Sequence, residues 1–305
     1  MRVLIIGYGS IARKHIAALN LVNAQAKIFA LRSSKSAPMI EGIINVYSYD
    51  EVQDLSIDFA LISNPTSLHM QTIKDLLRFE IPLFIEKPAF HKLDSAEAIN
   101  TLIKEKGIKT YIGCNLRFLD CIKYIYKLLN EQELRVNEVN VYSGSYLPLW
   151  RPGTDYKKCY SANEEMGGGA HLDLVHEIDY VYWLFGCPNM VKSTLRSVSS
   201  LEINAIDYAH YAIEYDQFCA NITLNYFRKI SKREIEILTS EDIWEVNLLS
   251  NSVYRNGNEV FKSDQTILDT YEDQMRYFID LCNEDEVSMN SFEDAIEVMK
   301  ICLND

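Results

Sequence analysis

The chain has 305 residues, of which 48% are apolar and 24% charged, and this balance excludes a disordered, collagen-like or disulfide-stapled protein. A length of this size predicts two domains. Forty-three acidic residues against thirty Lys and Arg give a net charge of −13, which argues against nucleic acid and membrane surfaces as partners and still allows a small anionic ligand.

The sequence predicts a cytoplasmic protein. The apolar run at the N-terminus is short and meets glycines, so we expect no secretory signal, and no run has the length of a membrane span. Cysteines are odd in number and contain no CxxC pair, which is typical of reduced thiols rather than of a zinc or redox motif. They stand at positions 114, 121, 159, 187, 219, 282 and 302.

Strand-like and helix-like segments alternate in the first 115 residues. We expect strands at Arg2–Gly7, Lys27–Leu31, Asp58–Ser63, Pro82–Ile85 and Lys109–Gly113, and helices at Ile11–Val22, Ser67–Phe79 and Asp94–Lys106. Strands that are apolar throughout, alternating with helices, predict a parallel sheet with both faces covered. We therefore predict an α/β fold whose N-terminal domain, residues 1–115, is a doubly wound Rossmann domain.

The pattern changes after residue 115, where alternating apolar and polar segments follow one another without helices between them. These segments are Asn137–Tyr146, Ile206–Asp216, Cys219–Phe227, Arg233–Leu238 and Ile243–Leu249. Helical spacing is found at Ala170–Phe185, Thr270–Cys282 and Phe292–Leu303. We predict an α+β domain over 116–305 with a large open, mostly antiparallel or mixed sheet, whose terminal helices are able to pack back on the first domain.

A dinucleotide-binding signature follows the first strand. Gly7-Tyr8-Gly9-Ser10-Ile11-Ala12 matches GxGxxG/A between a strand and a helix. Gly7 allows a tight turn, Gly9 allows the backbone to approach a pyrophosphate, and Ala12 lets the helix contact the strand. The helix N-terminus, with Ser10 and Ile11, offers N–H groups to phosphates. The alternative is a glycine turn that binds no ligand.

Residues after the second strand favour NADP(H) over NAD(H). An NAD site normally places Asp or Glu here, whereas this chain has Arg32, Ser33, Ser34 and Lys35. Cationic and hydroxyl donors suit a 2′-phosphate. The alternative is a solvated loop with NAD(H) as the cofactor.

Two further segments carry groups suited to proton transfer. Glu86-Lys87-Pro88 follows an apolar strand, and a lysine at the carboxyl end of a parallel strand lies where open α/β sheets bind ligands. In MGGGAHLDLVHEIDY, Asp173 and His176 are three residues apart, so we expect them to share a helix face. A carboxylate beside an imidazole suits general acid–base catalysis. A surface turn and a hydrogen-bonded structural pair are the respective alternatives.

A metal site is a further interpretation of the same helix. Metal-ligand types stand at His171, Asp173, His176 and Glu177, but their spacing fits no zinc helix pattern, and we predict no metal.

Taken together, GYGSIA, SNPT with His69, EKP, NLRF at 115–118 and GGG…D…H…D resemble the Gfo/Idh/MocA family of NAD(P)-dependent oxidoreductases. The resemblance implies a Rossmann domain, a C-terminal domain whose open sheet often forms a homo-oligomer interface (a dimer or tetramer), and hydride transfer between nicotinamide and a sugar or cyclitol. It places Lys87 and His176 at the substrate and Asp173 beside His176. Asp173 and His176 depart from the family, which more often spaces them by four.

The same resemblance extends the cofactor site. It adds Asn64, Pro65, His69, Glu86 and Arg117 to the glycine turn, Arg32, Ser33 and Lys87.

A long polar loop, Leu147–Glu165, precedes the three glycines. Long ordered loops are often functional, aromatic side chains suit sugar rings, and Arg and Lys suit carboxylates or phosphates. We expect substrate contacts from Trp150, Arg151, Tyr156 and Lys158 beside Asp173 and His176. The loop is similar to that of family members of surface-sugar biosynthesis, which points to an anionic or nucleotide-linked sugar. Packing against a neighbouring subunit is the alternative.

We therefore predict an NADP(H)-preferring sugar oxidoreductase. The alternative from another class is a non-catalytic dinucleotide-binding sensor or scaffold protein, which would have no need of matched proton-transfer groups. A metal-dependent hydrolase is the third interpretation.

Overall fold

The computed structural model describes residues 1–304, which divide into two compact units. Unit 1 consists of Met1–Asn115 and Ile267–Met299, and unit 2 of Leu116–Thr266 together with the residues from Lys300 onward. No helix within the described chain has both the length and the apolar character needed to cross a membrane.

Unit 1 contains a six-stranded parallel sheet, as predicted. The strand order is β3-β2-β1-β4-β5-β6, so the chain changes direction across the sheet between β1 and β4. The strands are β1 (Arg2–Ile6), β2 (Lys27–Leu31), β3 (Ile43–Val46), β4 (Phe59–Ile62), β5 (Leu83–Ile85) and β6 (Thr110–Ile112). Ligands in such sheets bind beyond the carboxyl ends of the strands at this reversal, which is the topological switch point.

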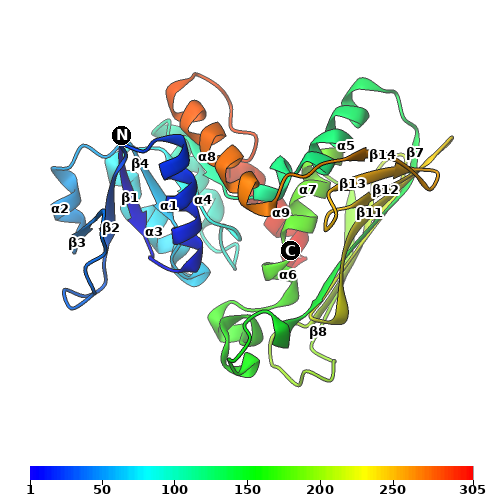
Figure 1. Ribbon diagram of the computed structural model, residues 1–305, viewed down its shortest axis with the longest axis horizontal. Helices are drawn as coiled ribbons and strands as arrows, with labels where there is room; N and C mark the ends of the chain where they lie inside the picture. Colours follow the sequence, from blue (N-terminus) through cyan, green and yellow to red (C-terminus); the bar gives the residue numbers. More distant parts are fainter. Residues whose placement is uncertain (305) are drawn as a thin grey trace. The chain divides into compact units, whose positions relative to one another are not determined.

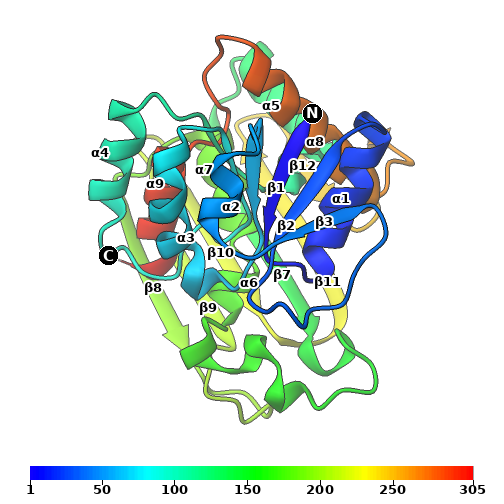
Figure 2. The same cartoon turned by 90° about the vertical axis from the view of Figure 1, so that its left-hand side faces the viewer.

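Helices cover both faces of this sheet (Figures 1 and 2). They are α1 (Ser10–Val22), α2 (Tyr49–Gln53), α3 (His69–Leu76), α4 (Ala96–Glu105) and α8 (Ile267–Asn283). Helix α8 lies beside α1, and its fully buried Phe278 meets the rings of Phe59 and Phe84 edge-on at 5.1 and 5.3 Å. These aromatic contacts pack α8 against the sheet of unit 1. The domain bounds 1–115 and 116–305, with terminal helices able to pack back on the first domain, stay a prediction.

Unit 2 is built on a mixed eight-stranded sheet, which confirms the predicted class. The order is β14-β13-β12-β11-β7-β10-β9-β8, and only β7 and β10 run parallel. The strands are β7 (Val136–Tyr146), β8 (Met190–Arg196), β9 (Tyr208–Glu214), β10 (Cys219–Asn225), β11 (Phe227–Thr239), β12 (Ile243–Asn247), β13 (Ser252–Arg255) and β14 (Asn258–Lys262).

The two faces of this sheet differ in polarity, because successive side chains of a strand alternate between them. Val139, Val141 and Ile222 are buried beneath helices, whereas Asn140 and Asn221 lie half-buried on the opposite face. The helices of this unit are α5 (Asp120–Glu131), α6 (Ala170–Asp173) and α7 (His176–Phe185), drawn in Figure 1.

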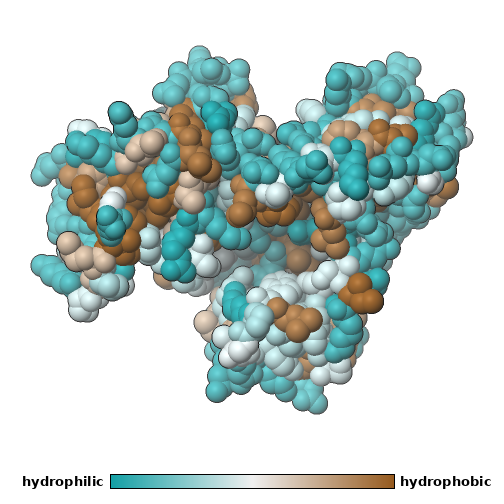
Figure 3. Space-filling view, viewed as in Figure 1, coloured by the Kyte–Doolittle hydropathy of each residue, from teal (hydrophilic) through white to brown (hydrophobic). Residues whose placement is uncertain are grey.

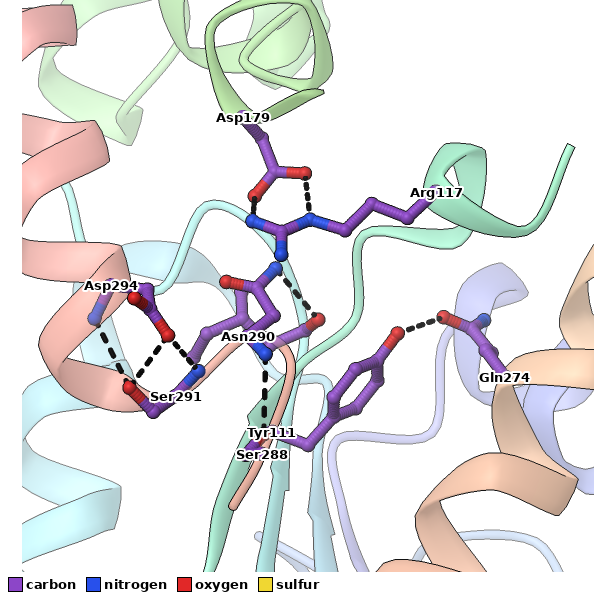
Figure 4. A network of polar contacts seen from close by, with 9 residues as sticks. Tyr111, Arg117, Asp179, Gln274, Ser288, Asn290, Ser291 and Asp294 are labelled. Carbon is purple, nitrogen blue, oxygen red and sulfur yellow. Dashed lines mark hydrogen bonds and ion pairs between the residues drawn. The ribbon is translucent and has the colours of Figure 1, made fainter. Parts of the chain in front are cut away.

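A last helix, α9 (Phe292–Leu303), begins with a reciprocal cap. The Ser291 hydroxyl accepts the Asp294 N–H at 3.2 Å, and the Asp294 carboxylate accepts the Ser291 N–H at 2.7 Å (Figure 4). Such a cap satisfies backbone donors that the first turn leaves without partners.

The predicted helix over Ala170–Phe185 is wrong as a continuous element. Helix α6 ends at Asp173, and Leu174 adopts φ −100° and ψ 29°, before α7 begins at His176. Tertiary contacts of both fragments override the local preference for one helix. The sequence pattern also failed to predict the short elements β3, α2, β13 and β14, and it missed α5 and β8.

The side of unit 1 drawn in Figure 3 carries both hydrophilic and apolar residues. Figure 3 shows apolar residues gathered over the region where Figure 1 draws β1 to β3, and the edge strand β3 contributes the half-exposed Ile44.

Candidate active site

The glycine turn after β1 is shaped by contact with the end of β4. Gly7 has φ +89°, and a Cβ there would overlap the backbone of Asn64. The Ser63 hydroxyl donates a hydrogen bond to the Gly7 carbonyl at 2.9 Å. Gly9 then precedes α1 with open space beside it, and Ala12 is fully buried against the sheet. The α1 N-terminus, with Ser10 and Ile11 in its first turn, is thus free of side chains where a phosphate would approach.

Asn64 and His69 join this turn to the segment that follows β5. The Asn64 side chain donates to Thr72 Oγ1 at 2.8 Å, and Pro65 starts the turn leading into α3. His69 is buried, with Nε2 2.8 Å from the Asn64 carbonyl oxygen and Nδ1 3.1 Å from that of Pro88. Burial lowers the pKa of His69, although the surrounding carbonyl groups and the Glu86 charge oppose the shift. His69 therefore holds two loops at the carboxyl edge of the sheet together.

Glu86 and Lys87 stand at the carboxyl end of β5. Glu86 is buried, and its carboxylate accepts the Lys87 N–H at 3.1 Å and a hydrogen bond from His15. Lys87 is half-buried. Gly7, Asn64, His69 and Lys87 thus belong to one connected set of contacts at the switch point.

Arg32 lies where β2 ends, at the position predicted to choose the cofactor. Its guanidinium lies over the ring of Tyr8, 5.4 Å from the centroid, and its backbone N–H binds the Val46 carbonyl at 2.8 Å. Nη1 is buried and has no hydrogen-bond partner among residues 1–304, and Ser33 follows directly. A buried donor without a partner is costly, which suits a site that an anion completes.

Arg117 is engaged within unit 2. It makes two hydrogen bonds to the Asp179 carboxylate, at 2.9 and 2.8 Å, and both side chains are buried (Figure 4). The Trp183 ring lies 5.4 Å from the guanidinium. The bidentate pair anchors the 3₁₀ turn Asn115–Phe118 to α7. A role of Arg117 at the cofactor stays a prediction.

The glycines before α6 permit close backbone packing. Gly167 and Gly169 have φ of +81° and +138°, and a Cβ on Gly168 would overlap the carbonyl oxygen of Tyr160. Three consecutive glycines thus let the 147–165 loop lie against the start of α6.

Asp173 is held by two tyrosines. One carboxylate oxygen accepts the Tyr160 hydroxyl at 2.8 Å, and the other accepts the Tyr226 hydroxyl at 2.6 Å. Burial, reinforced by the Asp173 charge, raises the pKa of both tyrosines, so both hydroxyls stay protonated and donate. His176 is the buried first residue of α7, so the argument that Asp173 and His176 share one continuous helix face does not hold.

Two of the metal-ligand types on these helices, Asp173 and Glu177, are bound by other side chains. The fully buried Glu177 carboxylate accepts two hydrogen bonds from Arg233, at 2.5 and 3.1 Å. Across residues 1–304 no group of three or more His, Cys, Asp or Glu side chains is arranged to hold a metal ion.

The 147–165 loop packs with residues of other segments in a small apolar core. Leu147, Ala162, Ala170, Leu201 and Tyr226 are its buried members. Trp150 packs edge-on against Tyr226 at 5.2 Å, and its N–H donates to Ser145 Oγ at 2.8 Å. The Tyr156 hydroxyl donates to the Leu201 carbonyl at 3.1 Å. These two predicted substrate residues therefore hold the loop in place.

Both cations that we predicted to contact substrate, Arg151 and Lys158, are exposed. Arg151 lies over the ring of Tyr160 at 5.2 Å, and Lys158 is largely exposed, 3.8 Å from Asp155. Arg151 thus contacts the tyrosine that binds Asp173.

Sequence reasoning missed His15, Tyr8 and Tyr226. Each acts through a partner distant in sequence, and a lone His or Tyr in an apolar segment gives no local signal of such contacts.

Two family models match the chain. Residues 1–114 match a model described as oxidoreductase family, NAD-binding Rossmann fold, and residues 132–302 match a model of the C-terminal alpha/beta domain of that oxidoreductase family.

Several curated proteins are similar in sequence to this chain. The scyllo-inositol 2-dehydrogenase (NADP(+)) IolW of Bacillus subtilis (strain 168) is 25% identical over 177 residues, 57% of this chain and 48% of IolW. The chain spans about half the length of the curated relatives it matches.

Solved structures match over almost the full chain. A levoglucosan dehydrogenase in complex with NADH has a TM-score of 0.86 at 16% identity, covering 99% of this chain and 95% of its own. The WlbA dehydrogenase from Bordetella pertussis, in complex with NADH and UDP-GlcNAcA, has a TM-score of 0.81 at 16% identity, covering 99% and 93%. At these identities the likeness shows a shared fold.

We predict that the stability of unit 2 falls as the pH drops below 6.5. Burial lowers the pKa of His171 from 6.5 to about 4, so the unfolded chain takes up this proton first. The stabilisation is complete above pH 6.5 and is lost progressively down to about pH 4, by roughly 3 kcal/mol. Urea unfolding of unit 2, followed by tryptophan fluorescence across this range, measures it.

The matched variant is His171→Gln, which has no titrating ring. Between pH 6.5 and 4, the free energy of unfolding of the variant should depend less steeply on pH, by up to the contribution of one proton. His69 and His91, whose pKa values burial also lowers, contribute equally to both proteins. Equal slopes in variant and wild type would contradict the assignment.

Proposed function

Because this chain belongs to the Gfo/Idh/MocA oxidoreductase family, we propose that it transfers hydride between NADP(H) and a hydroxyl or ketone group of a sugar or cyclitol. The observation that carries the proposal is the connected set of contacts at the switch point of the unit 1 sheet. It fixes Gly7, Asn64 and Lys87 at the carboxyl ends of β1, β4 and β5, where a dinucleotide and a proton-transferring group are both needed.

The residues present fit a dinucleotide. The Gly7 turn and the open space at Gly9 leave backbone N–H groups of α1 accessible to a pyrophosphate. Arg32, with its buried Nη1 and its stacking on Tyr8, supports recognition of a 2′-phosphate, and no acidic residue follows β2 to bind ribose hydroxyls. When bound, the nicotinamide supplies the hydride chemistry. We infer NADP(H) as the preferred cofactor and NAD(H) as the weaker one.

Lys87 and His176 are the proposed proton-transfer groups. In the oxidative direction His176 would accept the proton of the reacting hydroxyl, and the Lys87 ammonium would donate a hydrogen bond to the same oxygen. Asp173, with both oxygens bound by tyrosines, offers a fixed negative charge three residues before the start of α7. Its proposed role is to favour a protonated His176 once the proton has moved.

An anionic sugar is the substrate class we favour. Arg151 stacks on Tyr160, whose hydroxyl binds Asp173. Tyr160 thus connects a guanidinium to the proposed catalytic segment of unit 2. Guanidinium groups recognise carboxylates and phosphates in a bidentate manner. The names of two similar proteins, one acting on scyllo-inositol and one binding UDP-GlcNAcA, define the substrates to compare.

We also propose a homo-oligomer, a dimer or tetramer, formed through the half-buried face of the unit 2 sheet. Asn221 donates to Asn140 at 3.1 Å and Asn140 to Glu236 at 3.2 Å across β10, β7 and β11. A groove of about 360 Å³ lies over these strands. A broad sheet face that the chain's own helices leave uncovered suits a second copy.

Arg32→Ala should abolish the preference for NADPH. We expect the NADPH Kd to rise about 10- to 100-fold, since charge-assisted hydrogen bonds to the 2′-phosphate are lost, while the NADH Kd changes less than about threefold. Fluorescence titration with both cofactors measures this. Lys27→Ala removes the same charge at the opposite, exposed end of β2 and should change neither value. Unchanged NADPH affinity in Arg32→Ala would contradict the NADP(H) assignment.

Lys87→Ala should lower turnover far more than cofactor binding. We expect kcat to fall about 10²- to 10⁴-fold, as for loss of a proton-transfer group, with an NADPH Kd within about threefold of wild type. Initial rates with scyllo-inositol and UDP-GlcNAcA, among other sugars, measure it, and exposed Lys92→Ala is the control. Near-normal turnover in Lys87→Ala would refute the catalytic assignment. A wild type that binds NADPH but turns over no sugar would favour a sensor or scaffold.

Charges placed at the centre of the sheet face should dissociate the oligomer. Asn140→Glu combined with Asn221→Glu adds two negative charges beside Glu236 on each copy, and sedimentation velocity should then report a monomer. Val260→Glu on the edge strand β14 is the matched control and should leave the mass unchanged. A wild type that sediments as a monomer would overturn the proposal.

A further inference from the structure

A buried histidine pairs with the glutamate that precedes Lys87. His15, on α1, is fully buried, and its Nε2 hydrogen-bonds Oε1 of Glu86, which is 6% exposed. Burying two such groups is costly unless their polar atoms are satisfied. Inside unit 1, the Glu86 carboxylate therefore depends on His15 as a hydrogen-bond partner.

The surroundings of His15 are apolar and tight. The rings of Phe84 and Tyr271 meet the imidazole edge-on at 4.8 and 5.3 Å. A Cβ on Gly113 would lie 2.8 Å from the Phe84 ring and 3.2 Å from Glu86 Oε1, so only glycine leaves room for the carboxylate. The pocket fixes the position of both partners of the pair.

The hydrogen-bond pattern assigns the proton of the pair. His15 Nδ1 is buried with no partner among residues 1–304, and an N–H at that atom would be an unsatisfied donor. The proton therefore lies on Nε2, which donates to Glu86. The other carboxylate oxygen of Glu86 accepts the Lys87 N–H at 3.1 Å. His15 thus reaches the Lys87 backbone through one carboxylate.

The far side of Lys87 is fixed separately. His69 lies 3.1 Å from the Pro88 carbonyl oxygen and 3.2 Å from that of Ala89. One buried histidine therefore holds the chain just before the lysine and another holds it just after, while the lysine side chain stays half-buried.

We propose that His15 is a positioning residue that orients Lys87 through the Glu86 carboxylate. The inference rests on the proposed function of Lys87 and extends it. His15 stands on α1, the helix whose first turn is proposed to bind the pyrophosphate. Helix α1 would thereby position both the cofactor and Lys87.

Two variants with the same side-chain chemistry test the proposal. In His15→Gln the amide N–H falls near the position of Nε2 and keeps the donor to Glu86. In His15→Asn the amide falls near Nδ1 and does not reach the carboxylate. Both place an uncharged amide in the same pocket, so a purely structural effect should be similar in the two.

The expected result is a split between kcat and binding. His15→Asn should lower kcat about 10- to 100-fold, the size of effect expected from a small displacement of a reacting group, with sugar KM and NADPH Kd within about threefold of wild type. His15→Gln should keep kcat within about threefold of wild type. Hydrogen exchange of the Lys87 amide gives a readout that needs no substrate, and it should accelerate in His15→Asn alone.

Other outcomes separate the two proposals. Equal losses of kcat in both variants, or a rise in NADPH Kd that matches the loss in kcat, would overturn the positioning role while leaving the catalytic role of Lys87 intact. A wild type without turnover would remove the proposed function itself. If His15→Asn does not fold, Glu86→Gln, which retains the Lys87 N–H bond through its carbonyl oxygen, should accelerate exchange less than Glu86→Leu, and equal exchange in these two refutes the link.

Discussion

The absence of a side chain at Gly7 is the constraint on which the organisation of unit 1 depends. The Asn64 backbone occupies the space that a Cβ would need, and the Ser63 hydroxyl binds the Gly7 carbonyl. This close approach brings the ends of β1 and β4 together where the strand order reverses. From Asn64 the contacts continue through His69 to the segment after β5, so the positions of the glycine turn and Lys87 are interdependent.

Local pattern was enough to predict most of the fold. Apolar runs such as β1 and β4, and the helical spacing of α1 and α8, are properties of a few neighbouring residues, and the structure confirms them. The break between α6 and α7 could not be predicted in this way. It depends on Asp173 binding Tyr226, 53 residues away, and on Glu177 binding Arg233, 56 residues away.

The motifs of the candidate site could be predicted from the sequence, but the buried residues that hold these motifs in place could not. The glycine turn and the EKP segment carry their meaning in sequence order, and they fall on the same edge of the sheet. His15 carries no such signal, because its partner lies 71 residues away. The sequence also could not predict how the loop is held in place. The N–H group of Trp150 and the hydroxyl of Tyr156 bind Ser145 and Leu201, and a role of these two residues at the substrate stays a prediction.

The small core of the 147–165 loop also has a spectroscopic consequence. The chain has three tryptophans, Trp150, Trp183 and Trp244, and all lie in unit 2. Trp150 contacts Tyr226, the residue that binds Asp173, whereas Trp183 stacks on Tyr126 and Trp244 is buried on β12. A chain in which Trp183 and Trp244 are replaced by phenylalanine would therefore carry a single tryptophan that reports the state of the loop, while unit 1 contributes no indole signal.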